Sequence, residues 1–333
     1  TVRNQNNSVR SSSTTTTSAD GLTVTTLSDI DGDGTTDSKA VNVRLLNGDG
    51  SVTQTSSTYA GDQTTLTAKS ITHQSADRRT TTVTTDANGD GANDSVSSSV
   101  EAADGSQTIT ETQYHASGAV KSSSQTSVSA NGLTSTTQLD VDGDGVVDTV
   151  QTSATVLNAD GSRTLTAQQK NGDGSLRNQG VTIVSDDQLV TTTKTDADGN
   201  GGFERVNTST SVLNANGSVT TTVQSRSENN GLLSQTEQTR SDDGLVTTLK
   251  SDRDGYGGFD LTLTTSTVLQ NNGGTVETVE LRDAANLLRS KTITTASDDG
   301  RFITTTNDIN GDGHVDITSS YAEADNGTVT REE

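Results

Sequence analysis

The chain contains no cysteine, proline, methionine or tryptophan, and only 2% of its residues are aromatic. Without cysteine it forms no disulfide bonds, whichever compartment it occupies. Leu, Ile, Val and Phe together make up less than a fifth of the 333 residues, a level below which a strongly charged chain is suspected of disorder. A conventional apolar core is therefore hard to build, and either another source of order exists or the chain is unfolded.

Positive charge is also scarce, because 22 basic residues stand against 44 acidic ones and leave a formal net charge of −22. Nucleic acid is not an expected partner, since binding to phosphates needs a basic surface. Self-repulsion at this charge disfavours a compact state unless cations bind. The apolar runs are only two or three residues long, so we expect no membrane span and no signal peptide.

What the chain does have is an internal repeat, the first feature to look for in such a sequence. Similar twelve-residue segments, from SADGLTVTTLSD to SDDGRFITTTND, start at Ser18, Ser75, Ser129, Ser185, Ser241 and Ser297. They define repeats at 18–74, 75–128, 129–184, 185–240 and 241–296, a truncated sixth repeat at 297–333, and the end of a preceding repeat at 1–17. The two end fragments add up to about one unit, which fits an excerpt of a longer array or a ring closed by a split unit.

Each repeat of about 56 residues reads as short strands separated by turns. In the first, Val41, Val43 and Leu45 alternate with polar residues, and Asn47-Gly-Asp-Gly50 follows as a turn. Period-two alternation, many β-branched residues and Asn-Gly or Asp-Gly turns are typical of antiparallel hairpins. Because Thr and Ser fill many strand positions, we expect a narrow core between two thin sheets or inside a slim ribbon.

The predicted fold class is therefore all-β, with tandem four-stranded antiparallel repeats that form an elongated β-array or a superhelical ribbon. The alternative is a six-bladed β-propeller, which four strands per repeat and a split terminal unit would fit. The scarcity of bulky and aromatic residues counts against the propeller. A disordered calcium buffer is a third possibility.

A nine-residue acidic loop recurs at one place in each repeat. The six loops are DIDGDGTTD (29–37), DANGDGAND (86–94), DVDGDGVVD (140–148), DADGNGGFE (196–204), DRDGYGGFD (252–260) and DINGDGHVD (308–316). Ca²⁺ takes six to eight oxygen ligands, and a short loop with carboxylates at positions 1, 3 and 5 can surround it. Glycine at positions 4 and 6 lets the backbone turn sharply. Plain hairpin turns need only Gly, Asn or Asp at the tip, so recurrence at positions 1, 3, 5 and 9 favours metal.

The predicted ligands are side chains at positions 1, 3, 5 and 9 and the backbone carbonyl at position 7. They are Asp29, Asp31, Asp33, Thr35 and Asp37; Asp86, Asn88, Asp90, Ala92 and Asp94; and Asp140, Asp142, Asp144, Val146 and Asp148. In the later repeats they are Asp196, Asp198, Asn200, Gly202 and Glu204; Asp252, Asp254, Gly258 and Asp260; and Asp308, Asn310, Asp312, His314 and Asp316. Tyr256 removes one ligand, so we expect about six sites with the fifth the weakest, and Asn200 and Glu204 also weaken the expectation for the fourth.

The loop spacing resembles the first nine positions of an EF-hand, without its position-12 glutamate, which is Ala40 in the first loop. It looks like the DxDGDGxxD loops of dockerins, of thrombospondin type 3 repeats and of many large bacterial surface or secreted proteins. The resemblance covers nine residues per repeat and does not extend to the strands. It implies calcium binding and an extracellular setting.

Catalysis has little support in the sequence. The three histidines, His73, His115 and His314, do not recur in the repeat register, and none has a neighbour that suggests a nucleophile or a transition-metal site. We expect no enzyme. The leading hypothesis is a secreted bacterial fibre, adhesin stalk or surface layer that self-associates, with possible glycan or cell-surface contacts. The second is a propeller module that binds glycan or peptide.

Overall fold

The computed structural model describes residues 1–3, 6–325 and 327–332, which form 25 β-strands and no helix. The predicted all-β class is confirmed. None of these residues belongs to a helix long and apolar enough to cross a membrane. The chain divides into two compact units, one made of Thr1–Thr155 and Ala167–Arg177 and the other of Val156–Thr166 and Asn178–Glu333. Each unit is described by itself.

The first unit contains the strands of the first two repeats and part of the third. They are β1 (Val2–Arg3), β2 (Val9–Thr17), β3 (Thr23–Asp29), β4 (Ser38–Leu46), β5 (Val52–Ala60), β6 (Leu66–Gln74), β7 (Thr80–Asp86), β8 (Ser95–Glu101), β9 (Gln107–Tyr114), β10 (Val120–Val128) and β11 (Thr134–Asp140). Three further strands contribute residues to both units, namely β12 (Thr149–Leu157), β13 (Arg163–Asn171) and β14 (Leu176–Val184).

The second unit contains the strands of the later repeats. They are β15 (Val190–Asp196), β16 (Arg205–Leu213), β17 (Val219–Ser227), β18 (Leu232–Arg240), β19 (Val246–Asp252), β20 (Leu261–Leu269), β21 (Thr275–Asp283), β22 (Leu288–Ala296), β23 (Phe302–Asp308), β24 (Ile317–Glu323) and β25 (Val329–Glu332). Four strands per complete repeat, as expected from the sequence, are present in both units.

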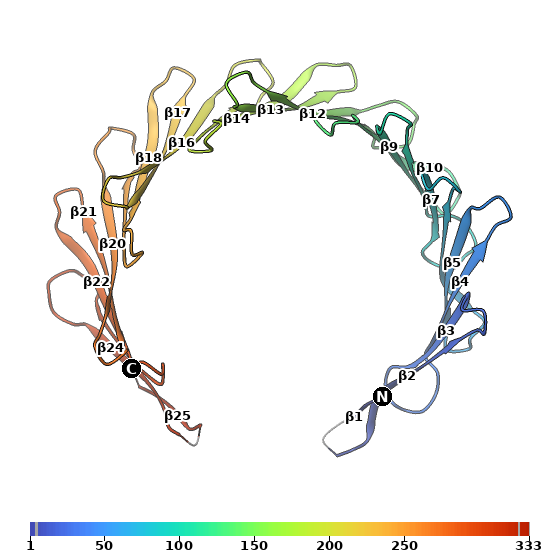
Figure 1. The fold of residues 1–333 in the computed structure, drawn as a ribbon, viewed down its shortest axis with the longest axis horizontal. Helices are drawn as coiled ribbons and strands as arrows, with labels where there is room; N and C mark the ends of the chain where they lie inside the picture. Colours follow the sequence, from blue (N-terminus) through green and yellow to red (C-terminus); the bar gives the residue numbers. More distant parts are fainter. Residues whose placement is uncertain (4–5, 326, 333) are drawn as a thin grey trace. The chain divides into compact units, whose positions relative to one another are not determined.

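Strands pair antiparallel with their neighbours in the sequence, and the pairing continues from one repeat into the next (Figure 1). The last strand of a repeat pairs with the first strand of the following one at β6–β7 and β10–β11 in the first unit, and at β18–β19 and β22–β23 in the second. The blades of a propeller are separate sheets. The propeller alternative is therefore wrong, and the continuous pairing is consistent with the predicted β-array.

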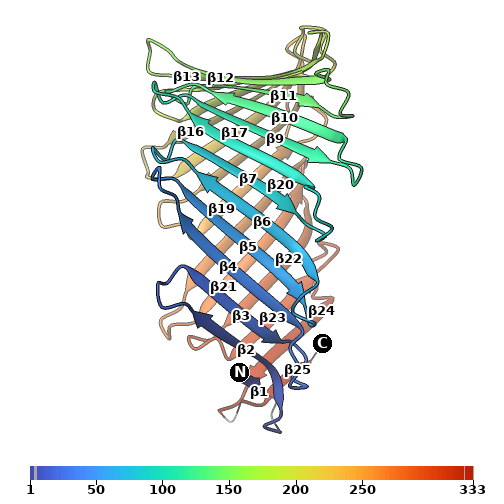
Figure 2. The same cartoon turned by 90° about the vertical axis from the view of Figure 1, so that its right-hand side faces the viewer.

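Within each unit the sheet is a single layer. Among residues 1–3, 6–325 and 327–332, the strand-to-strand contacts within a unit join only neighbours in the sequence. Strands β2 to β7 lie side by side in chain order (Figure 2). Among the described residues no apolar side chain is fully buried, and strand residues facing either side are mostly half-buried. The predicted narrow core is therefore wrong. Thr and Ser line both faces of the sheet, so neither face is apolar enough to recruit a second layer.

Cross-strand polar contacts take the place of core packing. Threonine hydroxyls meet across neighbouring strands, as at Thr126 and Thr137, whose Oγ1 atoms lie 2.9 Å apart. Lys250 Nζ lies 2.9 Å from Glu237 Oε1 on the adjacent strand. Such half-exposed pairs each contribute only a fraction of a kcal/mol, on the order of 0.2 to 1. The backbone ladder and the turns must therefore supply much of the order.

The segment that marks the start of each repeat is a hairpin turn. In the first repeat, Ser18 Oγ donates to Asp20 Oδ1 at 2.6 Å and accepts the Thr23 N–H at 2.9 Å, while the Leu22 N–H donates to Asp20 Oδ1. The same bonds recur at Ser75, Ser129, Ser185, Ser241 and Ser297. The turn chemistry thus explains why this motif recurs.

Candidate metal-binding loops

The six acidic loops occupy equivalent places, each between the first and second strands of a repeat. Position 1 is the last residue of the first strand, as Asp29 is of β3, and position 9 immediately precedes the second strand. The strand ladder therefore fixes both ends of each loop. In the third, fourth and fifth loops, carboxylate oxygens of positions 1 and 9 lie within 4.8 Å of each other.

The carboxylate at position 1 organises the backbone of its loop. Its Oδ1 accepts the N–H of position 4 at 2.6–2.7 Å, and its Oδ2 accepts the N–H of position 6 at 2.8–3.2 Å, in all six loops. In five loops this aspartate is buried, and Asp196 and Asp252 are only 1% and 2% exposed. Burial is the largest single influence on the pKa of Asp308 and raises it, but the backbone N–H groups of Gly313, Gly311, Asn310 and Asp312 together lower it by more, so the net shift is downward.

The other predicted side-chain ligands join the same network. The oxygen at position 3 accepts the N–H of position 5 at 2.9–3.2 Å, and the carboxylate at position 9 accepts the N–H of position 2 at 2.6–2.8 Å. Position 5 accepts the N–H of position 7 in every loop except the fifth, where Tyr256 carries no carboxylate. The ligand role of the position-7 carbonyls stays a prediction.

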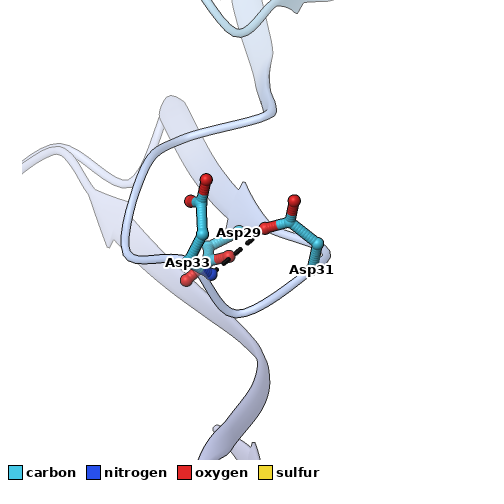
Figure 3. Close-up of side chains that lie close together, drawn as sticks. All are labelled: Asp29, Asp31 and Asp33. Atoms are coloured by element: carbon cyan, nitrogen blue, oxygen red, sulfur yellow. Dashed lines mark hydrogen bonds between the residues drawn. The ribbon is translucent and has the colours of Figure 1, made fainter.

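Carboxylate oxygens converge within 4.8 Å of one another in four of the loops. The groups are Asp29, Asp31 and Asp33; Asp140, Asp142 and Asp148; Asp196, Asp198 and Glu204; and Asp252, Asp254 and Asp260. Figure 3 shows the first group, with Asp31 accepting the backbone N–H of Asp33. The second and sixth loops have Asn88 and Asn310 at position 3, so they bring together fewer carboxylates. Four acidic groups that can hold a metal ion are thus in place.

Side-chain cations do not neutralise these groups. In residues 1–3, 6–325 and 327–332, every ion pair involves a carboxylate outside the loops. Like charges a few ångströms apart repel one another unless a cation or a proton compensates.

The surroundings of one carboxylate oxygen in the fourth loop show that the loop can accommodate a cation. Glu204 Oε2 accepts the Ala197 N–H at 2.8 Å, whereas Glu204 Oε1 is fully buried and has no hydrogen-bond partner. A buried carboxylate oxygen without a donor is costly, and a hard cation that prefers oxygen ligands would satisfy it. The donor set, made only of carboxylate, amide and carbonyl oxygens, suits Ca²⁺ better than a transition metal.

Glycine at position 4 has a steric task that the nine-residue motif does not reveal. A Cβ on Gly32 would lie 2.4 Å from the carbonyl oxygen of Val9, and a Cβ on Gly89 would lie 2.1 Å from that of Leu66. Val9 is the first residue of β2 and Leu66 is the first residue of β6. These strands precede the hairpins that carry the first and second loops. The equivalent Cβ atoms on Gly143, Gly255 and Gly311 would also lie 2.2–2.4 Å from a strand carbonyl oxygen. Five of the loops therefore lie against the neighbouring strand, a contact that depends on the register of the sheet and not on the motif.

The sequence also did not predict a role for two aromatic residues at position 8 of the loops. Phe203 and Phe259 lie beside lysines of β15 and β19, with Lys194 Nζ 5.8 Å and Lys250 Nζ 5.5 Å from the ring centroids. The rings cover the sheet next to the fourth and fifth loops and add cation–π contacts of about 0.5–1 kcal/mol each at such exposed sites. The signal in the sequence was the pair GGFE and GGFD, in each of which the Phe lies nine residues after a lysine.

The histidines form no common site. His73 Nδ1 lies 3.2 Å from Thr53 Oγ1 on the neighbouring strand, His115 begins a hairpin turn, and His314 occupies position 7 of the sixth loop. The expectation that the chain is not an enzyme stays a prediction.

Comparison with models of known protein families finds no match, and a search of curated proteins finds no significant relative. The nine-residue resemblance to known calcium loops therefore stands on the residues and geometry of the loops themselves.

Proposed function

We propose that the chain is a calcium-stabilised structural repeat protein. The observation that carries this proposal is the combination of a single-layer sheet without a buried apolar residue among the described residues and converging carboxylates that no side-chain cation neutralises. A cation that binds only the folded loops stabilises them by mass action, by about 3 kcal/mol per site at a hundredfold excess over Kd. Several such sites would offset the missing core.

The side chains at positions 1, 3, 5 and 9 would hold the ion. Positions 1 and 9 come from the ends of two paired strands, so an ion shared by them clamps the hairpin that begins each repeat. The ion supplies charge neutralisation and a fixed centre for the loop backbone. Asp29 and its equivalents, already bonded to two backbone N–H groups, hold the loop in the conformation that receives it.

An extracellular location is part of the proposal. Extracellular calcium modules work at Kd values of about 10⁻⁴ to 10⁻³ M, so such loops would stay empty in a calcium-poor cytosol and order after secretion. The net charge of −22 supports this sequence of events, because it disfavours compaction until cations bind.

Self-association into a fibre, adhesin stalk or surface layer is the proposed role of the array. Its repeats pair edge to edge without interruption within each unit, which is the nearest-neighbour construction of an extended repeat protein. Glycan or cell-surface contacts are a further proposed role of the exposed faces. The propeller that would have served as a compact binding module is ruled out by the strand pairing.

The test is electron microscopy of the native material and thermal unfolding of the chain, each with Ca²⁺ and with excess chelator. We expect filaments or sheets in Ca²⁺, and a melting temperature that falls when the ion is removed. Mg²⁺ at the same concentration is the matched control, because it demands a stricter octahedral geometry. Discrete particles with a melting temperature that ignores chelation would overturn the proposal.

A further inference from the structure

The second strand of a repeat ends in an exposed apolar pair in four of the six repeats. The pairs are Leu45 and Leu46, Val156 and Leu157, Val212 and Leu213, and Val268 and Leu269. In the second unit, which holds the last three pairs, the leucines are 64–71% exposed and the valines 49–60% exposed. Single exposed apolar residues are ordinary, but an apolar patch that recurs in register is typical of an interaction surface.

The pairs are exposed because the hairpin that carries them extends past the preceding turn. Ser211 of β16 donates its N–H to the carbonyl oxygen of Leu189 in that turn at 2.8 Å, and Thr267 of β20 makes the equivalent bond. Val212 and Leu213 follow this bond and pair with the next strand, β17. Strands β8 and β24, which lack an apolar pair, have seven residues where β16 has nine. The extension of the hairpin and its apolar pair therefore occur together.

The exposed pairs of the second unit form two rows, because successive residues of a strand point to opposite faces of a sheet. The leucine row is Leu157, Leu213 and Leu269, and the valine row is Val156, Val212 and Val268. Neighbours in a row are one repeat apart. A surface that covers a whole row must therefore present apolar side chains at the spacing of one four-stranded repeat. A second copy of this chain has that spacing.

The area of the two rows is also that of a contact between copies. Each of the six side chains exposes roughly 100 Å², the apolar area that corresponds to its transfer free energy. Covered on both faces by neighbouring copies, the six side chains and their counterparts would bury on the order of 1,200 Å², the lower end of specific protein interfaces. Because each copy has a row on either face, the contact can be repeated from copy to copy.

An aspartate lies against the tip of each of these hairpins. A Cβ on Gly161, Gly217 or Gly273 would lie 2.4–2.6 Å from a carboxylate oxygen of Asp186, Asp242 or Asp298, respectively. Two copies that meet through their rows therefore bring like charges toward each other. Salt screens exposed charges, so it should strengthen this contact, whereas it would weaken a contact with a basic partner.

We propose that the extended hairpin ends are the surface through which copies of this chain associate, with the leucine row of one copy packed on the leucine row of the next. This rests on the proposed self-association and names the residues that carry it. The valine rows on the outer faces allow further copies to add in the same way. Full overlap of two leucine rows places Leu213, the middle member, beside the same residue of the second copy, whether the two arrays run parallel or antiparallel.

The first test is analytical ultracentrifugation of the whole chain in Ca²⁺ over a series of NaCl concentrations. The leucine variant combines Leu157→Thr, Leu213→Thr and Leu269→Thr, because threonine suits a strand and removes much of the apolar area. The control variant combines Ile30→Thr, Val141→Thr and Ile309→Thr, whose side chains are 62–66% exposed in loops at the opposite ends of the strands. We expect the leucine variant to raise the dissociation constant of self-association by about a hundredfold or more, and the control variant to match the parent. Since all six side chains are exposed, both variants should keep their strands, which circular dichroism checks.

Cross-linking locates the contact, because the chain has no cysteine of its own. Under mild oxidation Leu213→Cys should form a disulfide-linked dimer, whereas Ile309→Cys, at the other ends of the strands, should stay monomeric. Association that is equally strong in the leucine variant, that weakens with salt, or that leaves Leu213→Cys unlinked would overturn this surface while the proposed self-association stands. Binding of the parent to phosphatidylcholine vesicles in place of a second copy would assign the rows to a lipid surface and overturn the proposal. A parent that stays monomeric at every salt concentration would overturn both this surface and the proposed self-association.

Discussion

At the scale of single residues, the two glycines of the second loop have different roles. Gly89 at position 4 and Gly91 at position 6 both have positive φ, at 76° and 87°. Only at Gly89 would a Cβ collide, since Leu66 O is 2.1 Å away, whereas nothing lies within 4 Å of a Cβ on Gly91. One glycine therefore serves backbone conformation alone, and the other also serves the contact between the loop and the neighbouring strand.

This difference predicts unequal costs for two matched substitutions. Gly91→Ala should destabilise the chain by about 1–2 kcal/mol, the usual penalty of the left-handed conformation for alanine. Gly89→Ala should cost about 3–4 kcal/mol, because the backbone must also shift away from Leu66. Urea unfolding in excess chelator measures both without interference from metal. Equal costs would show that the loop does not rest on the neighbouring strand.

The amide at position 3 of the second loop predicts a gain of function. Asn88→Asp adds a carboxylate beside Asp86 and Asp90 while keeping the oxygen that accepts the Asp90 N–H. We expect the calcium affinity of this loop to rise on the order of tenfold, because ligand charge sets affinity, and stability in chelator to fall through repulsion. Calcium titration and melting curves measure the two effects. If the variant melts at a higher temperature than the parent in chelator, the carboxylates of this loop do not repel one another as proposed.

At the scale of elements, the turns carry much of the polar order. In the turn between β5 and β6, Asp62 accepts bonds from the Thr65 hydroxyl and from the N–H groups of Thr65 and Thr64. The Thr65 hydroxyl contributes most to lowering the pKa of Asp62, to about 2, and the two N–H groups add to it. Serine hydroxyl and backbone donors likewise lower the pKa of the turn residues Asp20, Asp49, Asp160 and Asp187.

These shifts predict acid sensitivity of the hairpins. A carboxyl whose pKa falls on folding stabilises the folded state above its unfolded value of about 4, and this contribution is lost as the pH falls toward about 2. Unfolding measured in chelator from pH 5 to pH 2 should therefore show stability declining with acid. Asp62→Asn should be less stable near neutral pH and lose stability less steeply in that window. A parallel decline of parent and variant would refute the role of this turn.

A difference between repeats predicts a stabilising substitution. Beside the second loop, where Phe203 and Phe259 lie in later repeats, Asn93 leaves an open cavity of about 120 Å³ lined in part by Leu66 and Ile71. Asn93→Phe should fill it and raise the free energy of unfolding by about 1 kcal/mol through buried apolar area. Asn93→Ala is the control, and thermal melts compare the two. If both variants melt alike, the ring does not occupy the cavity.

At the scale of the whole molecule, the sequence predicted what local patterns determine. Repeat length, strand alternation and the loop positions 1, 3, 5 and 9 all depend on residues a few places apart, and the structure bears out the strands and their antiparallel order. The single-layer arrangement of the sheet could not be predicted from these local patterns. Thr25 and Thr26 point to opposite faces and are both half-buried, so the pattern does not say which face should be covered.

Contacts between segments that are distant in the sequence could not be predicted from the nine-residue motif either, because the motif contains only local residues. Glu228 lies 24 residues after Glu204, and its position beside Gly202 follows from the pairing of β16 with β17, in which Arg205 is opposite Ser227. A nine-residue motif therefore ranks the fourth loop low for its Asn200 and Glu204. The pairing of distant strands, which brings Glu228 beside Gly202, lies outside the motif.

The fifth loop is the weakest of the predicted sites, because Tyr256 at position 5 is 91% exposed and offers no carboxylate. Because the pairing runs from repeat to repeat within a unit, each loop affects chiefly its own hairpin and the next one. We expect stepwise removal of Ca²⁺ to release protection from hydrogen exchange first at 252–260, and excess chelator to lower the melting temperature of the whole chain. Tyr256→Asp should delay the first release, whereas Tyr256→Phe should not. Simultaneous loss in all loops would mean that the array responds as one cooperative body, and an unchanged melting temperature in chelator would mean that the ions do not hold it together.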